Sequence, residues 1–210
     1  MSKQQSRYDL KSYNPKLQSV LDDDLAITEA ILDYYDRPHS ARSIRAFLHQ
    51  HPFGSYITEI ADCLCQHGIE TTLVTAHPEL FTSKVWESIS ADFRAEKSRT
   101  SSLTEVTRVI KKGVLLQHRV PTISLIETEL EKRQPVIINC DLRFLQNETD
   151  VDLSFAIIVA ADDETFSITD SLLGDRIKKY PKKTVLYAIT ENMSRHPTAG
   201  SILLTREHAG

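Results

Sequence analysis

The sequence lacks the arrangements of glycine and cysteine that mark the commonest nucleotide and disulfide-rich proteins. Its six glycines form neither GxGxxG nor GxxxxGK, which disfavours nucleotide binding through those two loops. Its three cysteines are an odd number, and Cys63 and Cys65 lie too close along one predicted helix for an unstrained disulfide. We therefore expect a reducing, cytoplasmic setting.

Long hydrophobic runs and an excess of positive charge are also missing. No apolar stretch approaches the ~20 residues of a membrane-spanning helix, and the opening MSKQQSRYDLKSYNPK has no apolar run typical of a signal peptide. The net charge of -4 and the pI near 6.1 provide no basic surface for nucleic acid or an anionic membrane. We expect neither partner.

What is present suits one folded domain. The chain has 210 residues, of which 40% are hydrophobic and 26% charged, so it can bury a sizeable core. Residues 1–16 are polar, contain Pro15 and are predicted to form a flexible N-terminal arm. Residues 17–210 are predicted to form a single domain.

Helices are predicted early in the chain and strands late. The sequence predicts a helix from the Asp22–Asp24 cluster to Arg37-Pro38, a short helix capped by Ser40, and a third helix that ends at Gly68. The later predicted elements are a strand over 69–76, a weakly patterned helical region over 83–112, a helix over 123–133, a buried strand over 135–141, a hairpin over 153–170, a helix over 184–193 and a strand over 201–205. This order favours an α+β fold over alternating βαβ units.

The acidic run at the start of the first helix has two readings from its chemistry alone. Three aspartates, Asp22–Asp24, can stabilise the positive end of the helix dipole by about 0.3–1 kcal/mol. They could also begin a site for a hard cation, which would need further oxygen ligands. We favour the helix cap. His49 and His51, separated by two positions, point to different sides of a helix, so we predict no metal site and no cofactor.

The cysteines have few partners in the sequence. Cys63 and Cys65 have no second close Cys or His pair at zinc-site spacing, so we interpret them as packing residues. Cys140 ends a predicted strand, where a nucleophile at a loop rim could lie. A buried small side chain is the favoured interpretation of Cys140.

Several segments together resemble the papain-like cysteine peptidases of family thirty-nine, which process bacteriocin leader peptides and have stand-alone relatives. The resemblance is carried by Gln18 ahead of the first helix, by Tyr34-Tyr35 at its end, and by the segments KRQPVIINCD and LSFAIIVAADDETFSITDS. It covers most of residues 17–205. It implies a bacterial protein with a papain-like fold, in which N-terminal helices pack on a C-terminal antiparallel sheet.

The resemblance places the family's functional residues on four positions. Gln18 matches the glutamine that contributes to the oxyanion hole, and Asp170 matches the aspartate that orients the histidine. Counted back from the tyrosine pair, the nucleophilic cysteine falls on Asp23, and the catalytic histidine falls on Ser154. A cysteine peptidase needs a thiolate activated by an imidazole, and a serine hydroxyl hardly ionises near neutral pH. We therefore expect a degenerate triad without peptidase activity.

Three hypotheses follow. The favoured one is a non-catalytic, peptidase-like module that binds a peptide, a small amino compound or a partner protein in the former active-site cleft, with Asp22 and Asp24 attracting cationic groups. The second is an enzyme of altered chemistry, in which Asp23 and Asp170 act as an acid–base pair or hold a metal, or Cys140 or a histidine is recruited. The third is an assembly subunit or homo-oligomer that docks through the 83–112 region.

Overall fold

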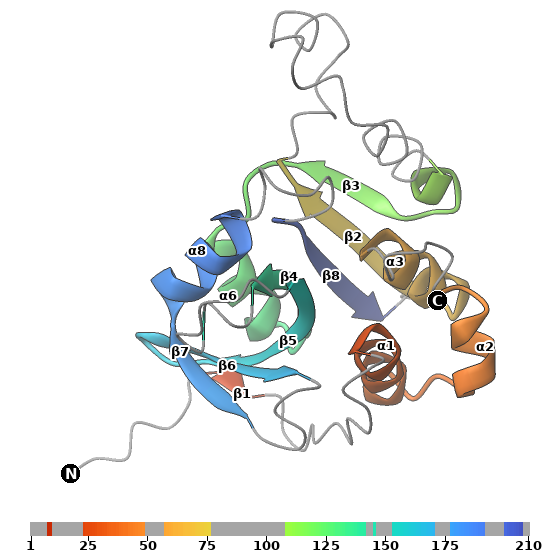
Figure 1. Ribbon diagram of the computed structural model, residues 1–210, viewed down its shortest axis with the longest axis horizontal. Coiled ribbons are helices and arrows are strands. Elements are labelled where there is room, and N and C mark those ends of the chain that lie inside the picture. The colour runs from red at the N-terminus through yellow and green to blue at the C-terminus, as the bar shows by residue number, and fades with distance from the viewer. Residues whose placement is uncertain are drawn as a thin grey trace, which may run out of the picture.

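The chain folds into one mixed sheet with helices on both faces, as the computed structural model shows (Figure 1). The structure describes residues 8–9, 23–48, 57–76, 108–141, 145, 153–170, 177–191 and 200–207. The helices are α1 (Asp23–Tyr34), α2 (Ala41–Arg45), α3 (Ile57–Gln66), α6 (Ile123–Glu131) and α8 (Lys182–Glu191), and the strands are β1 (Tyr8–Asp9), β2 (Ile69–Thr75), β3 (Leu115–His118), β4 (Val136–Asp141), β5 (Leu153–Ala161), β6 (Thr165–Asp170), β7 (Lys178–Pro181) and β8 (Ile202–Glu207). The prediction of an α+β fold is confirmed.

The sheet is mostly antiparallel. Seven strands follow the order β3-β2-β8-β4-β5-β6-β7, and β1 pairs with the end of β5 that extends beyond β4. The exception to the antiparallel arrangement is the parallel pair β2–β3. A parallel pair requires a crossover of a dozen or more residues, and residues 76–114 are long enough to provide it. The expected antiparallel sheet is therefore present, with one parallel pair and with β1 and β2 contributed from the first part of the chain.

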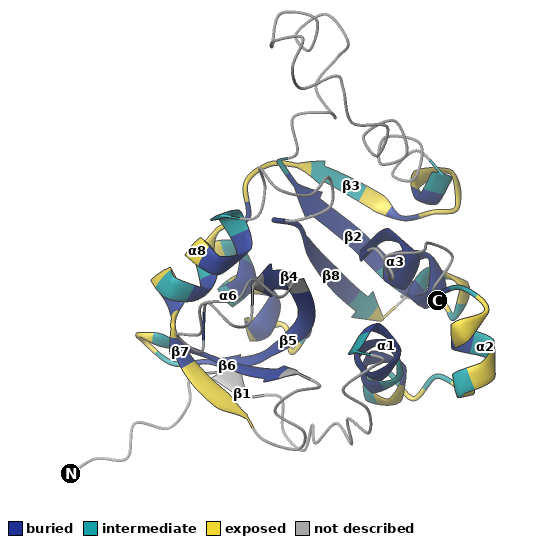
Figure 2. Ribbon diagram, viewed as in Figure 1, coloured by how far each residue is buried: buried dark blue, intermediate teal, exposed yellow. Residues whose placement is uncertain are grey.

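Two hydrophobic cores lie on opposite faces of this sheet. Helices α1, α2 and α3 cover one face, where they pack on Ile137, Phe155, Ile157 and Leu203. Helices α6 and α8 cover the other, where they pack on Val136, Ile138, Ala156 and Ile158. Alternate residues of β4 and β5 thus enter different cores, as expected for central strands. Nearly all of β5 is buried (Figure 2).

Local signals mark the start of α2 and the end of α3. The Ser40 hydroxyl accepts a hydrogen bond from the Ser43 N–H at 3.1 Å, and the Ser43 hydroxyl accepts one from the Ser40 N–H. This reciprocal pair is a capping box that starts α2. Gly68 has a φ of +76°, a value that glycine adopts without strain, and it follows the end of α3.

The predicted elements in the described ranges are present, with small shifts at their ends. Three strands were not predicted: β1, β3 and β7. Strand β1 lies within the predicted N-terminal arm and pairs through Tyr8 and Asp9 with Ala161 and Ala160. Most of the region predicted as helical over 83–112 lies outside the described residues, although 108–111 are helical.

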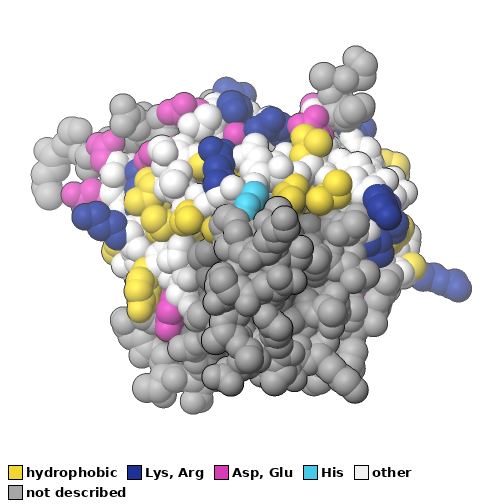
Figure 3. Space-filling model, turned by 90° about the horizontal axis from the view of Figure 1, so that it is seen from above, with side chains coloured by type: hydrophobic (Ala, Val, Ile, Leu, Met, Phe, Trp, Pro, Cys, Tyr) yellow, Lys and Arg dark blue, Asp and Glu magenta, His cyan; other side chains and the backbone are white. Residues whose placement is uncertain are grey.

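The surface carries both charges. On the face shown in Figure 3, Lys and Arg side chains lie among Asp and Glu side chains and do not form one basic patch over the described residues. Exposed apolar side chains include Leu115 on β3 and the nearby Val120. No helix in the described ranges is both long and apolar enough to cross a membrane.

Candidate functional site

The two ends of α1 contact opposite ends of the sheet. At its C-terminal end, the Tyr35 hydroxyl donates to the Thr205 carbonyl near the end of β8. At its N-terminal end, Asp23 contacts Phe155 near the start of β5. The strand pairings place the end of β4, the start of β5, the end of β6 and the start of β8 together at this second end. The predicted site residues within the described ranges gather here.

The Asp23 carboxylate bridges the helix and the sheet. Its Oδ1 accepts a hydrogen bond from the Asp24 N–H at 2.8 Å, within the first turn of α1. Its Oδ2 accepts one from the Phe155 N–H at 3.2 Å. A negative charge is favoured at this position because backbone N–H groups and the positive end of the helix dipole converge on it.

Asp24 has a different environment from Asp23. Its side chain is buried, and its Oδ1 accepts a hydrogen bond from the Leu25 N–H at 2.7 Å. The Thr28 hydroxyl donates to the Asp24 carbonyl at 2.7 Å, which ties the first turn to the second. The interpretation of the acidic run as a helix cap agrees with these contacts for Asp23 and Asp24. A ligand-binding role for Asp24 stays a prediction.

The position matched to the catalytic histidine lies next to Asp23. The N–H that Asp23 receives belongs to the peptide bond joining Ser154 to Phe155, so the carboxylate contacts the backbone at Ser154. Ser154 is 8% exposed. Alternation along β5 places its side chain on the α6–α8 face, directly across from Cys140.

Asp170 ends β6 and pairs with Ala156, two residues beyond Ser154. The backbone thus brings Asp23, Ser154 and Asp170 to one end of the sheet, and the roles that the resemblance assigns to them stay predictions. Gln18, Asp22, His49 and His51 lie outside the described residues, so their predicted roles stay predictions.

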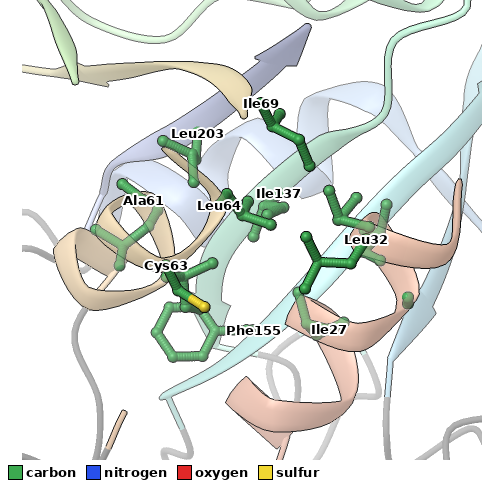
Figure 4. Packing of buried hydrophobic residues seen from close by; sticks show 14 of the residues in the cluster. Ile27, Leu32, Ala61, Cys63, Leu64, Ile69, Ile137, Phe155 and Leu203 are labelled. Carbon is green, nitrogen blue, oxygen red and sulfur yellow. The ribbon is translucent and has the colours of Figure 1, made fainter. Parts of the chain in front are cut away.

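Two of the three thiols are fully buried, and Cys65 is half-buried. Cys140 lies in the core beneath α6 and α8. Cys63 is also fully buried, and its side chain lies beside the Phe155 ring between α3 and α1 (Figure 4). Burial raises the pKa of the Cys63 thiol to about 12, with Asp62 adding to the effect. Within the described ranges, no cluster of three or more His, Cys, Asp or Glu residues could hold a metal ion.

Two groups at this site were missed by the sequence analysis. The Phe155 N–H is a backbone donor, which no residue type reveals. Asn139, near the end of β4, is 7% exposed and pairs directly with Phe155. An amide in the otherwise apolar PVIINC segment is a buried polar group, and that signal could have identified it.

Comparison with known proteins finds a likeness in structure alone. A double glycine motif protease from an AMS/PCAT transporter, solved in complex with the leader peptide, matches with a TM-score of 0.50 and 13% sequence identity. The match covers 95% of each chain. The two proteins share a fold. No protein-family profile and no curated protein sequence matches the chain.

The extent of the match makes the likeness informative about architecture. Because it covers nearly all of both chains, it includes the helices and the sheet together. At this identity, a shared fold does not carry over the other protein's chemistry or ligand. The function of this chain must therefore be argued from its own residues at the α1–β5 junction.

Proposed function

We propose that the chain is a papain-like domain related to family-thirty-nine peptidases that binds a peptide without cleaving it. The observation that carries the proposal is the Asp23 carboxylate, which accepts N–H groups from both α1 and β5. In the proposed correspondence, this carboxylate occupies the position of the nucleophilic thiolate. A carboxylate there keeps the negative charge but supplies no sulfur nucleophile for acyl transfer.

Two further features support binding over cleavage. Ser154, at the position proposed for the catalytic histidine, has a hydroxyl that is a poor general base near neutral pH. Cys140, which lies near the end of β4 and pairs with Ser154, is fully buried in the core beneath α6 and α8. The choice of a peptide as the ligand class is supported by the solved protease of the same fold, which was captured with a leader peptide. The negative charge of Asp23, flanked by Asp22 and Asp24, favours a peptide with cationic groups.

The test is peptide binding measured beside peptide hydrolysis. Fluorescence anisotropy would follow a short labelled peptide that contains a double glycine followed by lysines, and mass spectrometry would follow its cleavage. We expect the wild-type chain to bind the peptide and leave it intact. Asp23→Asn should weaken binding by about tenfold, because it removes the charge while keeping an acceptor oxygen.

Asp33→Asn is the matched control, because Asp33 lies on the same helix with an exposed carboxylate near His39. It should leave the affinity unchanged. Equal losses in both variants would indicate non-specific attraction and reject the site. Absence of binding to the wild type would reject the peptide-binding function. Cleavage that depends on Asp23 would replace it with the enzyme of altered chemistry.

The proposed correspondence of positions can be tested by restoring the missing groups. Alternation places the Ser154 side chain on the α6–α8 face, so the correspondence requires that an imidazole at position 154 reach the start of α1. If it does, the introduced thiol of Asp23→Cys/Ser154→His should be alkylated by iodoacetamide at least about tenfold faster at mildly acidic pH than that of Asp23→Cys alone, because a nearby imidazole stabilises the thiolate. Asp24→Cys/Ser154→His is the control, since Asp24 is buried. Equal rates for Asp23→Cys with and without the histidine would show that Ser154 does not correspond to the histidine position.

A further inference from the structure

Asn139 is a buried amide whose bonding is incomplete. The residue is 7% exposed, and its Oδ1 has no hydrogen-bond partner in the part of the chain that the structure describes. Buried acceptors are nearly always paired in folded proteins, so an unpaired one calls for an explanation. The hydroxyls of Thr58 and Thr169 are also buried with no partner among the residues that the structure describes, so the missing bond alone does not distinguish Asn139.

The position of Asn139 does distinguish it. Asn139 and Phe155 are direct cross-strand partners, and their N–H groups point away from each other, to Ser201 and Asp23 respectively. This is the arrangement of a non-hydrogen-bonded pair, in which the two side chains lie closest. Because Ile137 and Phe155 belong to the core beneath α1 and α3, alternation places the Asn139 side chain on that same face.

Asn139 therefore lies beside the residue whose N–H binds the proposed functional carboxylate. Asp23, at the start of α1, accepts a hydrogen bond from the Phe155 N–H. Asn139, near the end of β4, is the cross-strand partner of Phe155. A carboxamide carries a donor and an acceptor, which is the hydrogen-bonding pattern of a peptide group. The acceptor is the atom that has no partner here.

We propose that Asn139 is a specificity residue that accepts a hydrogen bond from a main-chain N–H of a peptide bound beside Asp23. This inference rests on the proposed peptide-binding function and identifies the backbone of the ligand as a recognised element. Asp23 supplies charge selectivity, and Asn139 fixes the position of the peptide main chain. An aliphatic residue at position 139 would satisfy the core better and bind the peptide less well.

The experiment measures stability and affinity in the same variant. Asn139→Leu should unfold at the same or a higher temperature than the wild type, because it removes a buried acceptor that has no partner in the described chain. The same variant should bind the labelled double-glycine, lysine-bearing peptide about tenfold more weakly. Gln134→Leu is the matched control, because Gln134 lies two residues before the start of β4 and its Oε1 is also buried with no partner among the described residues. It should leave the affinity unchanged.

N-methylated peptides then identify the recognised N–H. For one position of the methyl group, the methylated peptide should bind the wild type about tenfold more weakly than the unmethylated peptide does. Asn139→Leu should bind the two peptides equally, which is the coupling expected of directly interacting groups. Asn139→Ser provides a smaller change if the leucine variant does not fold. Equal affinities for wild type, Asn139→Leu and Gln134→Leu would overturn the inference while the Asp23 effect could still stand. Absence of wild-type binding would overturn both proposals.

Discussion

The two ends of α1 are built in different ways. At the C-terminal end, the Tyr34 hydroxyl donates to the Arg133 carbonyl at 2.5 Å and the Tyr35 hydroxyl donates to the Thr205 carbonyl at 2.8 Å. Nearby, the buried carboxylate of Glu129 accepts hydrogen bonds from Arg206 and Lys132. These side-chain contacts join α1, α6 and β8, so this end of the helix is held by paired polar groups.

The N-terminal end of α1 is joined to the sheet through Asp23. The Asp23 carboxylate links α1 to β5, yet the neighbouring Asn139 retains an acceptor with no partner in the described chain. Folded proteins usually satisfy every local rule except at sites that serve another purpose. Unpartnered buried atoms of the described chain also lie near the C-terminal end, at Arg37 Nε and Gln134 Oε1, so they do not by themselves separate the two ends. We assign the C-terminal end of α1 to stability because its tyrosine hydroxyls bridge the helix to the rest of the fold, and the N-terminal end to binding because the Asp23 carboxylate lies there.

The largest predicted change in stability is at Glu129, and it tests whether the C-terminal end of α1 serves the fold without affecting binding. Glu129→Ala leaves Arg206 and Lys132 without their shared carboxylate, and Glu129 itself is buried. Because both cations remain partly exposed, we expect a loss of about 2 to 3 kcal/mol in the free energy of unfolding, less than for a fully buried pair. Urea denaturation measures this loss.

Glu131→Ala, two residues later in α6 and exposed, should change stability by less than about 0.5 kcal/mol. Peptide affinity should be unchanged in both variants under conditions where they are folded. A large loss of affinity in Glu129→Ala would contradict the division between a structural end and a binding end.

A smaller effect is expected at Tyr35, and it depends on pH. Burial raises the pKa of the Tyr35 hydroxyl well above its usual value near 10. A raised folded-state pKa contributes stability that is fully present below about pH 10 and is lost as the pH rises above it, because only the unfolded chain then releases the proton. Tyr35→Phe should cost about 1 kcal/mol at neutral pH through the lost hydrogen bond to Thr205. Its unfolding free energy should fall less steeply above about pH 10.

Tyr34→Phe provides the comparison, because the adjacent Tyr34 is less buried and its pKa is raised by the same cause. Its alkaline slope should change less than that of Tyr35→Phe. Burial also raises the pKa of the Cys63 thiol, so this group too lowers the stability at alkaline pH. Because Cys63 is present in both variants, its contribution cancels when their slopes are compared. Identical alkaline slopes for wild type and Tyr35→Phe would show that the Tyr35 hydroxyl is not protected by burial.

The sequence predicted those parts of the molecule that local pattern determines. Two strand-like runs on either side of the polar DDET turn predicted the β5–β6 hairpin, and Ser40 and Gly68 predicted helix ends. Strands β1, β3 and β7 escaped prediction because they are short and form by pairing with a neighbour. The backbone contact between Asp23 and Phe155 was not predicted by any local pattern. The role proposed for Asn139 depends on its pairing with Phe155, which no local signal encodes.

The smallest effects concern the native thiols, which test whether the N-terminal end of α1 has a usable nucleophile. Cys63 and Cys140 are fully buried, and burial raises the pKa of both Cys63 and the half-buried Cys65. We expect iodoacetamide to modify the folded wild-type chain slowly and first at Cys65, as read by peptide mass spectrometry, with Cys63 and Cys140 reacting only after unfolding in urea. Neither peptide affinity nor unfolding free energy should change measurably on Cys65 modification. Rapid modification of Cys140 in the folded chain would instead place an accessible thiol across from Ser154 and favour the enzyme of altered chemistry.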